Sequence, residues 1–144
     1  EGVPMADVVT PNLPEAEKMS GITITTHQEM EQAARLIHRM GCKAGLVKGG
    51  HITGDATDIL FDGESLHVFA APRIDTKNTH GTGCTYSASI ASNLALGYTL
   101  IDAVELSKAY VTAAIEHAPN LGKGNGPTHH FYKIYKNGLT EVNI

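Results

Sequence analysis

The chain has 144 residues, a formal net charge of −4 and 42% hydrophobic residues, which fits one globular domain rather than a disordered chain. The acidic balance, without a cluster of Lys and Arg, argues against a nucleic-acid binder. No apolar run approaches the length of a membrane span, and Cys42 and Cys84 do not form the pattern of a disulfide framework. We therefore expect a cytoplasmic protein in a reducing compartment.

The first part of the chain has the pattern of a parallel crossover. Residues 6–10 predict a short buried strand, and a helix that ends at Gly21 follows it. A capping-box pattern at 26–29 predicts the start of a second helix, which ends at Gly41. Residues 44–48 then predict another apolar strand. The second helix has apolar residues at helical spacing: Met30, Ala34, Ile37 and Met40. Strand, helix, helix and strand in this order indicate an α/β unit.

The second part begins with a hairpin and continues with helices. Residues 58–61 and 66–69 predict two strands, and the turn at 62–65 contains an Asp-Gly signal. After a glycine-punctuated loop, residues 84–96 and 101–118 predict two helices. The expected fold class is α/β, with a β-hairpin and carboxyl-terminal helices.

Asn12 and Glu15 stand three positions apart where the first strand passes into the first helix. Oxygen ligands from an amide and a carboxylate suit Mg²⁺, either directly or through water. The same two residue types are also ordinary for a helix start, where they cap the first turn without any ligand. The spacing leaves both interpretations open.

Lys48 ends the second predicted strand and is followed by Gly49, Gly50 and His51. A lysine at a strand end can reach a phosphate as a point charge. A solvated lysine before a turn is the alternative, and the pattern alone does not separate the two.

Residues 81–84, Gly-Thr-Gly-Cys, open a predicted helix and form the most informative segment. The first N–H groups of a helix lack intrahelical partners, and the helix dipole favours negative charge near them. Gly81, Thr82 and Gly83 are therefore candidates for an anion-binding loop, with the thiol of Cys84 inside it and His80 as an orienting or ligand-contacting residue. The spacing is not that of a P-loop. A simple turn before a buried cysteine is the alternative.

Three motifs occur here in order: Asn-Leu-Pro-Glu at 12–15, Lys-Gly-Gly-His at 48–51 and His-Gly-Thr-Gly-Cys at 80–84. Together they resemble the ribokinase-like superfamily, in its hydroxymethylpyrimidine and phosphomethylpyrimidine kinase branch of thiamine biosynthesis. Residues 9–17, 124–127 and 130–131 are also similar to that branch. The resemblance covers nearly the whole chain and implies a ribokinase-like parallel-sheet sandwich.

The resemblance also implies roles. It implies that Asn12 and Glu15 organise Mg²⁺ and phosphates, and that Lys48 contacts the phosphates of ATP. It implies that Gly81, Thr82 and Gly83 form the anion hole for the transferring phosphoryl group. Cys84 matches the residue that accepts the proton of the substrate hydroxyl, where most of the superfamily has Asp. The implied acceptor is a small pyrimidine alcohol.

Members of this family carry a further amino-terminal half with most of the pyrimidine pocket. We therefore expect residues 1–144 to form a single partial domain, the carboxyl-terminal and nucleotide-side half, which is inactive alone. An exposed sheet edge and an uncovered apolar face would make it associate with the missing half or with itself. Two alternatives stay open: a pyridoxal kinase of the same branch, and a non-catalytic nucleotide-binding or interaction module.

Overall fold

A computed structural model describes residues 6–49, 55–74, 81–118, 126, 128–130 and 132 of the chain. It divides into two compact units, Glu1–Arg73 and Ile74–Ile144. A single partial domain over the whole chain stays a prediction. None of the helices in the described part of the chain combines the length and the apolarity needed to cross a membrane.

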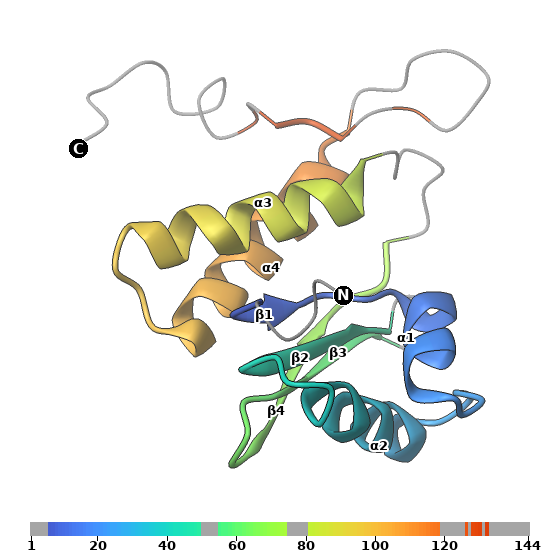
Figure 1. Ribbon diagram of the computed structural model, residues 1–144. Coiled ribbons are helices and arrows are strands. Elements are labelled where there is room, and N and C mark those ends of the chain that lie inside the picture. The colour runs from blue at the N-terminus through green and yellow to red at the C-terminus, as the bar shows by residue number, and fades with distance from the viewer. Residues whose placement is uncertain are drawn as a thin grey trace. The chain divides into compact units, whose positions relative to one another are not determined.

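The first unit contains a four-stranded sheet whose strands lie in chain order (Figure 1). Its strands are β1 (Val8–Val9), β2 (Ala44–Lys48), β3 (Ala56–Phe61) and β4 (Leu66–Ala71). β1 pairs with β2 in parallel, with Val8 opposite Ala44, whereas β2–β3 and β3–β4 are antiparallel. The predicted crossover and hairpin are therefore confirmed, and the described sheet is mixed rather than wholly parallel because the hairpin extends it.

Two helices cover one face of this sheet, α1 (Leu13–Ser20) and α2 (His27–His38) (Figure 1). Each begins with a capping box, and Gly21 ends α1 in the left-handed conformation with φ 75°. The apolar side chains of α2 and of the strands form a buried hydrophobic core, which includes Met30, Ala34, Ile37, Val47, Ile59 and Phe61.

Met40 is the exception to the predicted apolar face of the second helix. α2 ends at His38, with Arg39 as its C-cap, so the helical spacing that would bring Met40 to the core stops before it. Its side chain is 42% exposed. The prediction that this helix runs to Gly41 is therefore wrong, and Met40 lies outside it.

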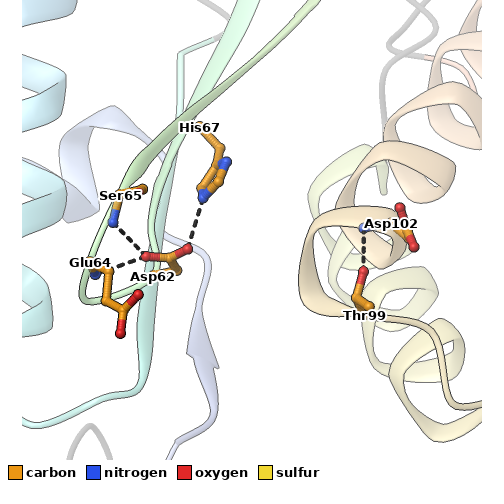
Figure 2. A network of polar contacts seen from close by, with 6 residues as sticks. All are labelled: Asp62, Glu64, Ser65, His67, Thr99 and Asp102. Carbon is orange, nitrogen blue, oxygen red and sulfur yellow. Dashed lines mark hydrogen bonds and ion pairs between the residues drawn. The ribbon is translucent and has the colours of Figure 1, made fainter.

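The second unit contains α3 (Thr82–Ala95) and α4 (Leu100–Glu116), which pack against each other. Asn93 Nδ2 donates a hydrogen bond of 3.0 Å to Oγ of the fully buried Ser107, which joins the two helices. Thr99 is the N-cap of α4, and its hydroxyl accepts from the Asp102 amide at 3.2 Å (Figure 2). Both predicted helices are confirmed, but α3 begins at Thr82 instead of residue 84, so Cys84 lies within its first turn.

Candidate functional site

The carboxyl ends of β1 and β2 meet at one place in the first unit. The Lys48 amide donates a hydrogen bond of 2.9 Å to the Pro11 carbonyl, and Asn12 and Lys48 form a parallel β-bridge. The structure therefore brings Asn12 and Lys48 together although 36 positions separate them in the sequence. Glu15 joins them through the first turn of α1.

Asn12 and Glu15 form a reciprocal capping box. The Glu15 amide donates to Asn12 Oδ1 at 2.9 Å, and the Asn12 amide donates to Glu15 Oε2 at 2.9 Å. Helix capping, one of the two roles that the sequence left open, is thus present. Capping uses only one carboxylate oxygen of Glu15, because Oε1 makes no hydrogen bond within the described part of the chain. Both side chains are exposed, so Glu15 can cap α1 and still face a ligand.

An open hollow of about 390 Å³ lies beside this strand end. Its lining is mostly apolar and carries charged groups from Glu15 and Lys18 of α1. The sequence reasoning did not single out Lys18. Its position three residues after Glu15 was the available signal, since residues at that spacing share a face of a helix. The full lining is Val9, Thr10, Pro11, Glu15, Lys18 and Met19.

The main chain after Lys48 is held by a buried carboxylate. The Gly49 amide donates a hydrogen bond of 3.1 Å to Oδ1 of Asp58, whose residue is only 4% exposed. Sequence reasoning placed Asp58 in a strand and gave it no role. The available signal was an acidic residue directly before the apolar run Ile-Leu-Phe in a predicted strand. Asp is rarely buried without a partner, so its place there indicates a polar contact.

The second unit presents the glycine segment at the start of α3. Gly81 is the N-cap with φ 79°, in the left-handed region that favours glycine, and its carbonyl accepts the first helical bond from Thr85 at 2.9 Å. Having no side chain, Gly81 offers no acceptor to the amides of Thr82, Gly83 and Cys84. The helix start predicted for anion binding is therefore confirmed as a helix start, and its role in binding stays a prediction.

The two cysteines differ in their surroundings. Cys84 is exposed on the first turn of α3, whereas Cys42 is 1% exposed, with Sγ 3.5 Å from the Ile37 carbonyl. Burial raises the pKa of the Cys42 thiol, which keeps it protonated. Cys42 thus packs near the end of α2, and Cys84 is the thiol that a substrate could reach.

Asn12, Glu15 and Lys48 belong to one unit, and Gly81–Cys84 belong to the other. Their joint action stays a prediction. His51, His80 and most of segments 124–127 and 130–131 lie outside the described residues. The described residues contain no group of three or more His, Cys, Asp or Glu side chains that could hold a metal ion.

The fold and these motifs define a class of small-molecule kinases. Residues 1–129 match the family described as phosphomethylpyrimidine kinase, and the chain belongs to that family.

Three similar proteins show how much of the chain the likeness covers. The thiamine biosynthesis bifunctional protein of Geobacter sulfurreducens is 52% identical over 88% of this chain and 26% of its own length. The hydroxymethylpyrimidine/phosphomethylpyrimidine kinase of a Staphylococcus aureus strain is 45% identical over 96% of this chain and 51% of its own. The crystal structure of Bacillus subtilis pyridoxal kinase in an ADP complex has a TM-score of 0.85 and 39% identity, covering 90% of this chain and 51% of that one. The chain therefore spans about half the length of the two kinases and about a quarter of the bifunctional protein.

Proposed function

We propose that this chain supplies the nucleotide-binding, carboxyl-terminal half of a cytoplasmic ATP-dependent kinase that phosphorylates hydroxymethylpyrimidine and its monophosphate in thiamine biosynthesis. The observation that carries the proposal is the meeting of Asn12 and Lys48 at the ends of β1 and β2. It brings the backbones of Asn12 and Lys48 together, with Glu15 in the first turn of α1, at a strand edge of the kind where α/β sheets bind ligands. Family membership and the names of the relatives support the same activity.

Mg²⁺ fits the residues at this edge. Mg²⁺ in kinases is held by one or two carboxylates together with waters and substrate phosphates, so a large protein cluster is not needed. Glu15 Oε1 is available for this, while Asn12 Oδ1 already accepts the Glu15 amide, which favours a contact between Asn12 and Mg²⁺ through water. When bound, Mg²⁺ neutralises charge on the phosphates of ATP. Lys48 would contact the same phosphates.

The glycine segment would stabilise the transferring group. Backbone N–H groups of Gly81, Thr82 and Gly83 at the start of α3 suit the charge that develops on a phosphoryl group. Cys84, exposed on the same turn, would act as the thiolate and take the proton of the substrate hydroxyl, becoming the thiol, as the hydroxyl oxygen bonds to phosphorus. ADP would leave with the electrons of the broken P–O bond.

A pyridoxal kinase activity is the second candidate. It is favoured by the likeness of this chain to Bacillus subtilis pyridoxal kinase at 39% identity and a TM-score of 0.85. The residues that would choose between two small aromatic alcohols are expected in the other half of the family's length. A non-catalytic nucleotide-binding module would keep the strand edge and lack turnover.

We also propose that the chain works in association with that other half or as a homo-oligomer. Large apolar side chains are exposed in both units, including Val68 at 60% and Leu96 at 76%. Such side chains favour association when they lie in a contiguous patch.

Reconstitution tests the proposal. The 144-residue chain would be assayed with Mg-ATP and hydroxymethylpyrimidine or pyridoxal, alone and mixed with the complementary half of the Staphylococcus aureus relative. We expect no turnover alone, turnover in the mixture, and a larger species in light scattering. Preference for pyridoxal would establish the second candidate, and ATP binding without turnover would establish the non-catalytic module.

Cys84→Ala is the matched variant for the catalytic role. It removes an exposed thiol, so folding should be unchanged, while turnover of the mixture should fall about 10²- to 10⁴-fold, the usual contribution of general-base catalysis. Cys42→Ala serves as the control for loss of a thiol elsewhere and should destabilise the fold without a specific loss of turnover. Full turnover of Cys84→Ala, or an ordinary rate from the unmixed chain, would contradict the proposal.

A further inference from the structure

We propose that Asp58 is the positioning residue for Lys48, acting through the main chain of Gly49. The inference rests on the proposed role of Lys48 in binding phosphate. Asp58 belongs to β3, on the strand next to the one that Lys48 ends, and Lys48 and Asp58 are directly opposite each other in the antiparallel register. Its own carboxylate is buried and so is not expected to touch the nucleotide.

The hydrogen bond between Asp58 and Gly49 lies directly beyond the end of β2. β2 ends at Lys48, so the Gly49 amide is the first one past the strand, and Gly49 is buried. A buried amide without an acceptor is costly, and Oδ1 of Asp58 supplies the acceptor at 3.1 Å. A carboxylate makes a stronger acceptor than a neutral group, which suits a fixed main-chain position.

The core also packs closely against Gly49. A Cβ at this position would lie 2.5 Å from Cε of Met30 and would overlap the Thr57 carbonyl. The backbone of Gly49 is therefore fixed by the core as well as by Asp58.

Lys48 is thus fixed by hydrogen bonds on both sides. Its own amide donates to the Pro11 carbonyl at 2.9 Å, which ties it to the residue before Asn12. The next amide, of Gly49, donates to Asp58. The Lys48 side chain consequently departs from a backbone that is in register with Asn12. Loss of the Asp58 acceptor would release the second of these two bonds and let the lysine shift relative to Asn12 and Glu15.

Hydrogen exchange of the Gly49 amide, followed by NMR in the 144-residue chain, tests the first step without any nucleotide. Asp58→Ala should speed this exchange by roughly tenfold or more, as expected for loss of a hydrogen bond to a charged group. Asp58→Asn keeps an acceptor oxygen and should retain most of the protection, which rescues the variant if Asp58→Ala folds poorly. Asp55→Ala, at an exposed aspartate just before β3, is the matched control and should change nothing.

Calorimetric titration of Mg-ATP tests the second step with the chain mixed with the complementary half of the Staphylococcus aureus relative, using Lys48→Ala, Asp58→Ala and the double variant. Asp58→Ala should weaken binding about fivefold, and the double variant should bind no more weakly than Lys48→Ala, because coupled residues are not additive. Unchanged Gly49 exchange in Asp58→Ala, or losses that multiply in the double variant, would overturn the proposal. If Lys48→Ala binds normally, or no variant binds Mg-ATP, the proposed function of Lys48 fails, and Gly49 exchange still decides the positioning by Asp58.

Discussion

The two units begin their site-bearing helices in different ways. α1 begins with a reciprocal cap, in which the side chains of Asn12 and Glu15 each accept a hydrogen bond from the other's backbone amide. α3 begins with Gly81, which has no side chain to give. In the first unit the helix start is therefore capped by the side chains of Asn12 and Glu15, whereas in the second the cap residue offers no side chain.

The difference teaches how one local pattern can serve two purposes. Side-chain capping rigidifies Asn12 and Glu15 and presents a carboxylate oxygen of Glu15 in a fixed place. A glycine cap instead keeps the approach to the first-turn amides clear of side-chain atoms. The first arrangement suits a metal-organising group, and the second suits a phosphoryl group. The largest expected effects of substitution should follow the same division.

Glycine substitution should give the largest contrast between the units. Gly49→Ala in the first unit should lower the free energy of unfolding by about 3 kcal/mol, the upper range for overpacking, because the added Cβ meets Met30 and the Thr57 carbonyl. Gly81→Ala in the second unit meets no atom of the described residues within 4 Å and should cost only about 1 kcal/mol for its left-handed conformation. Urea denaturation measures both. Equal losses would show that packing does not distinguish these glycines.

Removing a capping side chain tests whether the α1 start has a role beyond capping. Asn12→Ala and Thr26→Ala each remove the N-cap of a capping box in the same unit, and each should cost about 1 kcal/mol of stability. Only Asn12 lies beside Lys48, so only Asn12→Ala should also weaken Mg-ATP binding. The stability losses come from urea denaturation and the affinities from calorimetry. Equal affinities in the two variants would leave Asn12 as a cap alone.

Acid should have a smaller effect, confined to the first unit. Asp62 in the β3–β4 turn accepts from the Ser65 and Glu64 amides at 2.7 and 2.8 Å and lies 2.8 Å from His67 Nε2 (Figure 2). These contacts, led by the Ser65 amide, lower the pKa of Asp62 from 3.8 to about 2. Because the folded pKa lies below the unfolded one, the stabilisation is complete above pH 3.8 and is lost as the pH falls towards 2.

The measurement for this effect is a pH series of urea unfolding between pH 5 and 2, with NMR signals of the turn amides as a local probe. Asp62→Asn should flatten the part of the pH dependence that comes from the turn. Glu64→Gln is the control, since Glu64 contributes its main-chain amide to the network. The Thr99 hydroxyl that caps α4 in the second unit does not titrate in this range and should show no matching change. An unchanged acid slope in Asp62→Asn would contradict the assignment.

Much of the local structure could be predicted from the sequence because its causes are local. The capping box at 26–29, the stop at Gly21 and the turn at 62–65 each depend on residues within a few positions of one another. Met40 could not be placed in this way. Apolar spacing included it in a helix that was expected to end at Gly41, but it lies beyond the last residue of α2 and is exposed.

The residues of the candidate site also divide into those that local motifs predict and those that depend on distant contacts. Asn12, Glu15, Lys48 and the segment 81–84 could be selected from motifs, and Glu15 as both cap and candidate ligand follows from its spacing to Asn12. The role of Asp58 could not be predicted, since it depends on the amide of Gly49, nine positions earlier and just past the end of the neighbouring strand.

The sequence by itself determined the order of helices and strands, the helix starts at the two capping boxes, the stop at Gly21 and the family, because these are carried by adjacent residues and by motifs in order. Only the tertiary structure decided that Lys48 pairs with Asn12, that Asp58 accepts from Gly49, and that Cys42 is buried while Cys84 is exposed. The reason is that pairing between strands and burial depend on which distant segments pack together, and local preference does not specify that choice.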